Sequence, residues 1–160
     1  YTLPENTIEH EMFVKGSRYL RDHGFNQYEI SHFANEGMEC AQNIHYWKGD
    51  PYLAFGPSAH GFDGAKRYWN VNSLTNYNKI LSKNKLPILN SEVLSYENIL
   101  NEIIINGLRT NSGIPNSYLY KLSDKIQKWE KYLKRENNSL LLKPEYFHLA
   151  DEIATDLIIY

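Results

Sequence analysis

Apolar residues follow a helical spacing over much of the chain. They recur every three or four positions, the period that places them on one face of a helix. On this pattern helices are predicted at residues 7–23, 73–82, 91–106, 123–135 and 149–159, with a one- or two-turn helix at 114–120. Gly24 and Gly107 are expected to end the first and third helices, because glycine readily takes the left-handed conformation found there.

Strand signals are fewer and shorter. Apolar residues alternate around Tyr28 and Ile30, which predicts a strand, and Asp63-Gly64 and Asn137-Asn138 are turn signals beside short apolar runs. The strands predicted are 25–31, 52–55, 67–71 and 140–142. Residues 32–50 show neither period and are expected to form a loop.

The order of these elements indicates two parts, divided near residue 90. In residues 1–90 a helix runs directly into a strand, as in one half of a βα unit, and parallel strands need partners on both sides. Because the first residue is also not methionine, we expect that an N-terminal part is missing. Residues 91–160 show the order helix, short helix, helix, strand-turn-strand, helix, typical of a winged-helix-like domain. The predicted fold class is α+β.

Composition and charge argue against several classes of function. The formal net charge is −2, and acidic residues interrupt the lysines of the predicted 123–135 helix, so nucleic-acid binding is not predicted. A single cysteine excludes an internal disulfide framework and any site that needs several thiolates. The chain has neither an apolar run of about 18 residues that could span a membrane nor a basic-then-apolar leader, so a cytoplasmic protein is expected.

Candidate chemistry is concentrated between residues 28 and 69. Three of the six histidines, two of the three tryptophans and the single cysteine lie there. Aromatic and imidazole side chains around a glycine-rich turn suit a flat conjugated ligand, which they bind by stacking and edge contacts. Metal ligation by His32, His45 and His60 is the alternative, but their spacing matches no common metal motif and only Cys40 is a soft partner. No nucleophile–base pair is recognisable, so no catalytic or metal-ligating residue is predicted.

Three charged residues are further candidates. Glu29 stands near the carboxyl end of its predicted strand, the end that faces the active site in barrel-type α/β folds. Arg67 and Arg109 each carry a planar guanidinium group, which can bind one carboxylate through two parallel hydrogen bonds. Arginine side chains more commonly form exposed ion pairs.

Four ordered motifs carry a family resemblance. They are Tyr28-Glu-Ile-Ser-His-Phe-Ala34, Asn43-x-x-Tyr46-Trp47, Tyr52-Leu-Ala-Phe-Gly-Pro-Ser-Ala-His60 and Gly107-Leu-Arg-Thr110. The combination closely resembles the oxygen-independent coproporphyrinogen III oxidase family of radical S-adenosylmethionine (SAM) proteins, HemN and HemW, and most of all the HemW haem-chaperone branch. The resemblance covers essentially the whole chain. It implies that residues 1–90 are the last part of a partial (β/α) barrel with its extension, and that 91–160 are the family's C-terminal domain.

The resemblance also implies cofactors, held mostly by the full-length parent. The earlier barrel strands would carry the CxxxCxxC ligands of a 4Fe–4S cluster and the glycine-rich SAM segment, and neither occurs here. The chain alone is therefore expected to be inactive as an enzyme. By position, Glu29 and Ser31 would face the cofactor, and the turn containing Gly56, Ser58, Ala59 and His60 would line the SAM side of the cavity.

A further implied site concerns haem. The family segment His-Asn-x-x-Tyr-Trp is associated with haem binding, and here it is Gln42-Asn43-Ile44-His45-Tyr46-Trp47. Gln42 replaces the histidine and cannot ligate iron comparably, so the hypothesis is that His45 takes that place.

Three functions stay open at this point. The first is haem binding and delivery, with porphyrin or haem, the missing N-terminal radical SAM half and a haem-accepting protein as partners. The second is oxidative decarboxylation of coproporphyrinogen propionates to vinyls, as in the oxidase branch. The third is a winged-helix interaction module without catalysis.

Overall fold

The computed structural model describes residues 4–159, which form a mixed fold of helices and strands and confirm the α+β class. The helices are α1 (Asn6–Asp22), α2 (Ala41–Trp47), α3 (Leu74–Leu81), α4 (Tyr96–Arg109), α5 (Ser123–Trp129) and α6 (Ala150–Leu157). The strands are β1 (Asn26–Glu29), β2 (His32–Ala34), β3 (His60–Phe62), β4 (Lys66–Asn70), β5 (Ile88–Val93), β6 (Ile114–Pro115), β7 (Leu133–Glu136) and β8 (Ser139–Leu142). Three 3₁₀ helices are Asn116–Lys121, Glu130–Tyr132 and Pro144–Leu149.

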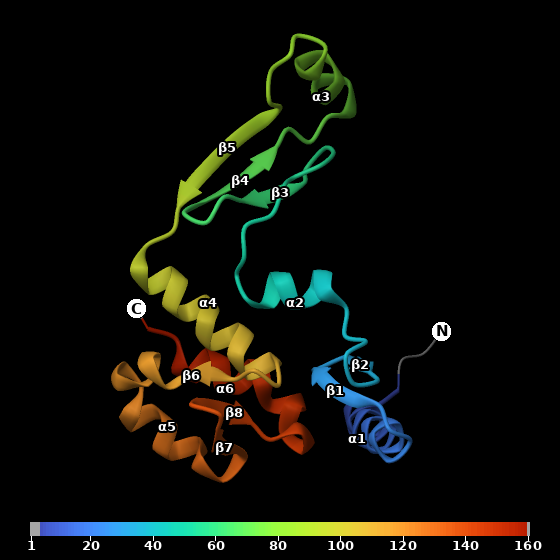
Figure 1. The fold of residues 1–160 in the computed structure, drawn as a ribbon, viewed down its shortest axis with the longest axis vertical. Helices are drawn as coiled ribbons and strands as arrows, with labels where there is room; N and C mark the ends of the chain where they lie inside the picture. Colours follow the sequence, from blue (N-terminus) through green and yellow to red (C-terminus); the bar gives the residue numbers. More distant parts are fainter. Residues whose placement is uncertain (1–3, 160) are drawn as a thin grey trace.

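The molecule is elongated, with α3 at one end and the C-terminal helices together with α1 at the other (Figure 1). The β3–β4–β5 sheet lies between these ends, and α2 lies between that sheet and α1. Within residues 4–159 no helix is both long and apolar enough to cross a membrane.

The main hydrophobic core lies in the C-terminal part. α4 packs against α6 and against β6 and β8 of the antiparallel sheet β6–β8–β7. The side chains most completely buried are Leu100, Ile104, Leu108, Ile114, Leu122, Leu142, Phe147, Ile153 and Leu157. The helices and the β7–β8 hairpin follow the order predicted for a winged-helix-like domain. The expected short helix is the 3₁₀ helix Asn116–Lys121, and a short strand, β6, precedes it.

Strands in the first part pair only antiparallel within the described residues. β1 and β2 form a hairpin, and an isolated bridge joins Glu29 of β1 to Thr110, the residue after α4. β4 lies between β3 and β5 in the second sheet. Gly24, with a φ of +87°, ends α1 as predicted and turns the chain into β1.

The predicted loop over residues 32–50 is wrong, because it contains β2 and α2. These elements have three and seven residues, and no side chain of α2 is fully buried. Elements this short do not display a readable period. The predicted strand at 52–55 is also wrong: Tyr52 forms a single bridge with Phe62, and β3 is the partner of β4.

The predicted start of the 91–106 helix is wrong. Residues 88–93 form β5, all six of them exposed, so no alternation of buried and exposed positions marks the strand. α4 begins at Tyr96, where the Ser95 hydroxyl accepts a hydrogen bond of 3.1 Å from the Asn98 amide. The division near residue 90 falls within β5 and stays a prediction.

The predicted ends of two helices are also wrong. The helix expected over 123–135 ends at Trp129, and a 3₁₀ turn leads into β7. α4 continues past Gly107 to Arg109. Gly107 is needed for close packing instead: a Cβ there would lie 2.7 Å from the Ile114 side chain and 2.8 Å from the Gly113 carbonyl oxygen.

Substituting alanine at two helical glycines should therefore give opposite results. Gly107→Ala inserts a methyl group against backbone and should lower the free energy of unfolding by about 1–3 kcal/mol. Gly16→Ala is the matched control, because a Cβ at this exposed position of α1 meets nothing within 4 Å. It should raise the free energy of unfolding by about 0.5–1 kcal/mol. Urea unfolding measures both, and a neutral Gly107→Ala would contradict the packing argument.

The contact between α1 and the last 3₁₀ helix should depend on pH. The rings of His10 and His148 are 4.3 Å apart between centroids, and partial burial together with the neighbouring His10 lowers the pKa of His148. The unfolded chain, with an ordinary histidine pKa of about 6.5, then binds the proton more readily than the folded chain. Stability should therefore be retained above that pH and fall as the pH drops through it. Urea unfolding at neutral and acid pH tests this, and His10→Gln should reduce the loss.

Candidate functional site

The carboxylate of Glu29 lies at the centre of a buried polar cluster. Its residue is 2% exposed, and a buried charge is strongly destabilising unless other groups compensate it. The Ser31 amide donates to Glu29 Oε2 at 3.0 Å, and the His32 Nδ1 atom contacts the same oxygen. Nη2 of Arg109 lies 4.0 Å from Glu29 Oε1. The tight β1–β2 hairpin places Ser31 and His32 beside Glu29.

Arg109 connects this carboxylate to two helices. Its Nη1 atom donates to Asp151 Oδ1 of α6 at 2.6 Å, and its guanidinium carbon lies 5.5 Å from the ring centroid of Trp47 in α2. Its Nε atom is buried and has no hydrogen-bond partner within residues 4–159. Glu29, His32, Arg109 and Trp47 are called the Glu29 cluster below.

Backbone hydrogen bonds hold β1 against the end of α4. The Ile30 amide donates to the Arg109 carbonyl at 3.1 Å, and the Asn111 amide donates to the Tyr28 carbonyl at 3.1 Å. These bonds, with the antiparallel bridge between Glu29 and Thr110, pair the end of β1 with the segment that follows α4. They join the motifs of residues 28–34 and 107–110, and the contact between Arg109 and Trp47 adds the motif of residues 43–47.

A cleft of about 540 Å³ lies between α2 and α4 and is called the α2–α4 cleft. Tyr28, next to Glu29, lines it, as do the apolar side chains of Ile44 and Trp47 from α2 and Ile99 and Ile103 from α4. Its polar lining includes Lys48, Glu102, Asn106 and Asn111. This volume is within the ~300–1,000 Å³ range of small-molecule and cofactor sites.

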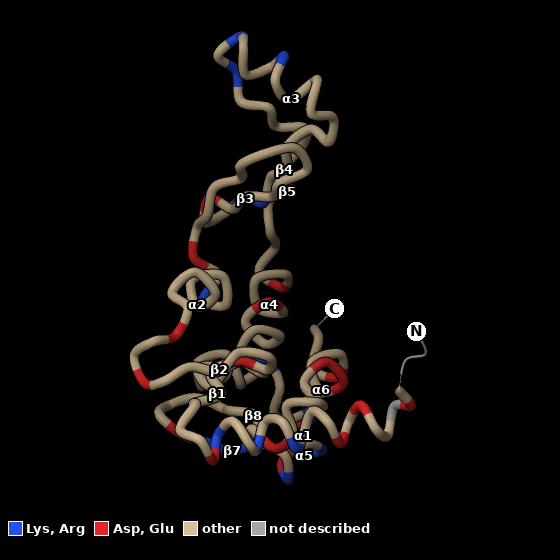
Figure 2. Tube along the Cα trace, turned by 90° about the vertical axis from the view of Figure 1, so that its right-hand side faces the viewer, with Lys and Arg blue, Asp and Glu red and all other residues tan. Residues whose placement is uncertain are grey.

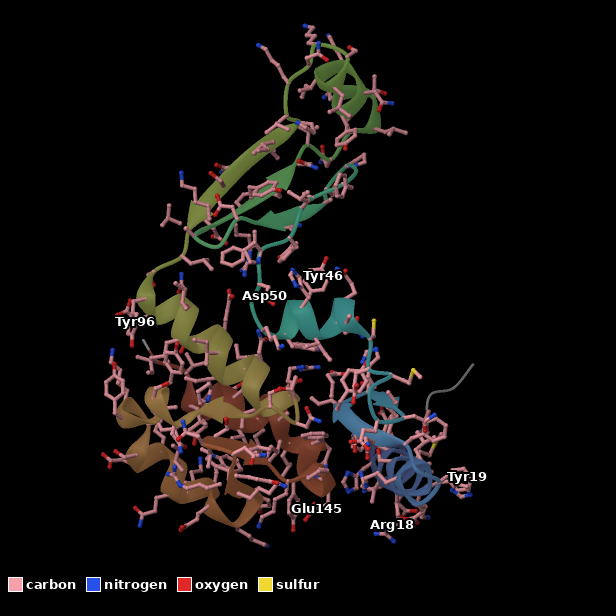
Figure 3. The ribbon with its side chains drawn as sticks, in the orientation of Figure 1. Arg18, Tyr19, Tyr46, Asp50, Tyr96 and Glu145 are labelled. Carbon is pink, nitrogen blue, oxygen red and sulfur yellow. The ribbon has the colours of Figure 1, made fainter. Side chains whose placement is uncertain are left out.

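The segment 42–47 is divided between two faces of α2. Ile44 and Trp47, three positions apart, line the cleft. Tyr46 belongs to the other side, which faces the β3–β4–β5 sheet (Figure 3), and His45 does not line the cleft either. The Tyr46 ring meets Tyr52 edge-on at 4.6 Å between centroids. Asn43 is half-buried on α2 and does not line the cleft, and Gln42 is exposed.

Both ring nitrogens of His45 face oxygen atoms. Nε2 lies 2.7 Å from the Pro51 carbonyl oxygen, and Nδ1 lies 3.4 Å from Asp50 Oδ2. A carbonyl can only accept, so Nε2 carries a hydrogen in this arrangement. Iron ligation through Nε2 would require this hydrogen bond to break, and the Asp50 carboxylate lies beside Nδ1.

The turn from Gly56 to His60 lies with the β3–β4–β5 sheet, away from the cleft lining. The buried Asn70 side chain donates to the Gly56 carbonyl at 3.0 Å, and the Gly56 amide donates to the Tyr77 hydroxyl at 3.1 Å. The Ser58 amide donates to Val71, and the Ala59 amide to Gly56. The His60 ring stacks on Trp69 with centroids 5.9 Å apart. The backbone amides of Gly56, Ser58 and Ala59 therefore already donate hydrogen bonds within the protein. A ligand could contact this turn only through its side chains.

Of the ten site residues predicted from sequence, Trp47 lines the α2–α4 cleft. Glu29 and Ser31 are hydrogen-bonded to each other beside the cleft. Ile99 and Ile103 belong to the apolar stripe of the predicted 91–106 helix, and such a stripe looks the same in the sequence whether it faces a core or a cleft. Sequence reasoning did not single out Asn70 or Asn106, since isolated polar residues give no periodic signal.

The charges and ligands available limit the chemistry of this site. Acidic and basic positions are mixed at the end of the molecule that contains α1 and α5, while lysines near α3 gather at the opposite tip (Figure 2). Within residues 4–159 no group of three or more His, Cys, Asp or Glu side chains is placed to hold a metal ion. A 4Fe–4S cluster needs several cysteine thiolates, and the whole chain has one cysteine. The residues present therefore do not fit such a cluster.

Comparisons with known proteins show which proteins the chain resembles. No family model matches it. It is 34% identical to the heme chaperone HemW of Bacillus subtilis over 112 residues, which cover 70% of this chain and 30% of that protein. It is 30% identical to the mitochondrial radical S-adenosyl methionine domain-containing protein 1 of Mus musculus, over 79% of this chain and 30% of that protein. The chain is related to the HemN/HemW-like radical SAM proteins.

A solved structure agrees at the level of the fold. The coproporphyrinogen III oxidase HemN of Escherichia coli, described as a radical SAM enzyme, matches 99% of this chain with a TM-score of 0.69. Sequence identity is 14%, and the match covers 42% of the HemN chain. The chain thus resembles a C-terminal portion of HemN/HemW-like proteins and spans about 30% of the two sequence relatives' length.

Removing the Arg109 charge should weaken the contact between β1 and the end of α4. Arg109→Gln leaves the Glu29 carboxylate buried beside fewer positive groups, and should lower the free energy of unfolding by about 1–3 kcal/mol. Exchange of the Ile30 amide hydrogen should accelerate as well. Arg18→Gln, at an exposed position of α1, is the control and should stay within about 0.5 kcal/mol of the unmodified chain. Equal stability of the two variants would show that the Arg109 charge does not support Glu29.

Proposed function

We propose that this chain binds a porphyrin, most simply haem, as part of a haem-carrying protein, and that the α2–α4 cleft is the binding site. The observation that carries this proposal is the cleft itself, lined by Trp47 of the family's haem-associated segment and by apolar side chains of α4. The heme chaperone HemW of Bacillus subtilis, similar over 70% of this chain, supports haem as the ligand.

The cleft lining suits a flat, largely apolar ring that carries carboxylates at its edge. Trp47, Ile99 and Ile103 offer apolar contact area, and an indole gains additional stabilisation by stacking. Lys48 and the side-chain amides of Asn106 and Asn111 can donate to propionate oxygens. Two acidic residues, Glu39 and Glu102, line the cleft; Glu102 is paired with Arg67 Nη2 at 2.7 Å, which compensates its charge.

Haem carriage is favoured over oxidase activity for the chain as it stands. Carriage needs a binding cleft, whereas the radical chemistry of the oxidase branch needs a cluster that this chain has no thiolates to hold. Oxidase activity remains the alternative for a longer protein whose other segments supply the cluster and SAM. The roles of Glu29, Ser31 and the Gly56–His60 turn toward SAM belong to that alternative. A winged-helix nucleic-acid module has less support, because the net charge is −2.

Titration with ferric haem tests the proposal. One haem per chain should bind saturably, with a shifted Soret band and quenching of tryptophan fluorescence. Trp47→Ala should weaken binding by about tenfold, because a lost aromatic contact removes roughly 0.5–1.5 kcal/mol beyond the area it buries. Trp69→Phe, in β4 and outside the cleft lining, is the matched control and should leave the affinity unchanged.

Two results would overturn the proposed site. Haem binding without saturation would mean nonspecific adsorption to apolar surface. Equal affinity of the Trp47→Ala variant and the unmodified chain would place bound haem elsewhere on the molecule.

A further inference from the structure

The end of the molecule that contains α3 is basic, although the chain as a whole is acidic. Residues 73–89, called the α3 tip below, comprise α3 with its N-cap residue, the segment that follows α3, and the first two residues of β5 (Figure 1). They include Lys79, Lys83 and Lys85 and no acidic residue, while the formal net charge of the chain is −2. The three lysines are exposed, and the tip contains no carboxylate that could neutralise them.

Large aliphatic side chains are exposed on the same tip. Five of them are between 41% and 77% exposed: Leu74, Leu81, Leu86, Ile88 and Leu89. Leu74 and Leu81, seven positions apart, lie on one face of α3. Leu86 and Ile88 also line a hollow of about 470 Å³ with the exposed side chains of Leu53 and Phe55. Apolar surface therefore continues from the tip onto the segment before β3, and exposed apolar surface of this extent is typical of an interaction site.

Hydrogen bonds hold the tip in place on the β3–β4–β5 sheet. The Tyr77 hydroxyl accepts from the Gly56 amide at 3.1 Å, and the Val71 amide donates to the Pro87 carbonyl at 2.9 Å. Between Lys83 and Lys85 the chain turns at Asn84, which has a φ of +54°. The lysines and leucines are thus presented by an ordered element, which lowers the entropy cost of binding.

The combination of lysine and aliphatic side chains indicates the kind of partner. Protein interfaces are depleted in lysine and enriched in arginine, and the tip has three lysines and no arginine. Nucleic-acid phosphates attract lysine, but they give exposed leucines no apolar surface to bury against. An anionic lipid surface uses both kinds of side chain. Its headgroups attract lysine, and aliphatic side chains enter the boundary between the headgroups and the acyl chains.

We infer that the α3 tip binds the surface of a membrane that contains anionic lipids. The lysines contact headgroup phosphates, and the exposed leucines enter the headgroup layer beside them. Lysine suits this position because its long aliphatic stem packs against apolar surface while its ammonium group stays in water. No residue of the tip lines the α2–α4 cleft, so this inference does not depend on the proposed haem binding.

Flotation of the 160-residue chain with lipid vesicles tests the inference. Phosphatidylcholine vesicles that contain phosphatidylglycerol should bind the chain, and added salt should weaken binding. Pure phosphatidylcholine vesicles should bind it at least ~10-fold more weakly. Replacing Lys79, Lys83 and Lys85 together by glutamine should weaken binding to the anionic vesicles about 100-fold, because each lysine near an anionic surface contributes roughly fivefold.

Two further variants separate the tip from general effects of charge. Replacing Lys121, Lys125 and Lys131 by glutamine changes the same number of exposed charges near α5, at the other end of the molecule. This control should bind within about twofold of the unmodified chain, because charges far from the lipid are screened by salt. Leu86→Asn, at the most exposed of the five apolar positions, should weaken binding about tenfold. Circular dichroism checks that each variant is folded.

Four results would overturn the inference. If the unmodified chain did not bind anionic vesicles, the apolar surface of the tip would be left for a protein segment to cover. Equal binding to both kinds of vesicle would mean nonspecific adsorption. Equal loss of binding in the α5 control would place the contact outside the tip. Binding that needs the lysines but is unchanged in Leu86→Asn, with equally tight retention on DNA, would identify a general polyanion site. Haem titration is independent of all four results.

Discussion

The pairing of the buried Glu29 carboxylate is the interaction on which the arrangement around the cleft depends. Its residue is 2% exposed, and its partners come from the β1–β2 hairpin and from the end of α4. Removing a partner from such a charge is more damaging than exchanging the whole group, because the desolvation cost remains. The charge therefore favours one relative placement of β1, α4 and, through Arg109 and Trp47, α2.

The sequence predicted elements well where they are long and one-sided. α1, α3 and α6 and the Asn137-Asn138 turn follow from periodicity and turn chemistry, and both asparagines have positive φ. Prediction failed for β5, which is exposed throughout, and for α2, whose seven residues leave no buried stripe. Hydrophobic patterning reports burial, so elements that bury little cannot be found by it.

The candidate site could be predicted from the sequence only in part, for a related reason. Residues such as Trp47 stood out by type, but the direction in which a side chain points depends on the helix that carries it. Two of the unusual residues of the 42–47 segment, His45 and Tyr46, do not line the cleft, and Tyr46 packs against Tyr52 instead. His32 and Glu29 are close in sequence, but Arg109, which also faces Glu29, lies 80 positions after Glu29. The sequence alone does not show that these three side chains meet.

The ion pair between Arg67 and Glu102 has a mechanical consequence. It joins the β3–β4–β5 sheet to the middle of α4, while the chain itself passes from β5 to α4 through Leu94 and Ser95. Phe62 of the sheet lines the cleft together with residues of α2 and with Ile103 of α4, so the cleft borders both of the elements that this ion pair joins. A small rotation of the sheet about these points would therefore change the width of the cleft on the side that Phe62 lines.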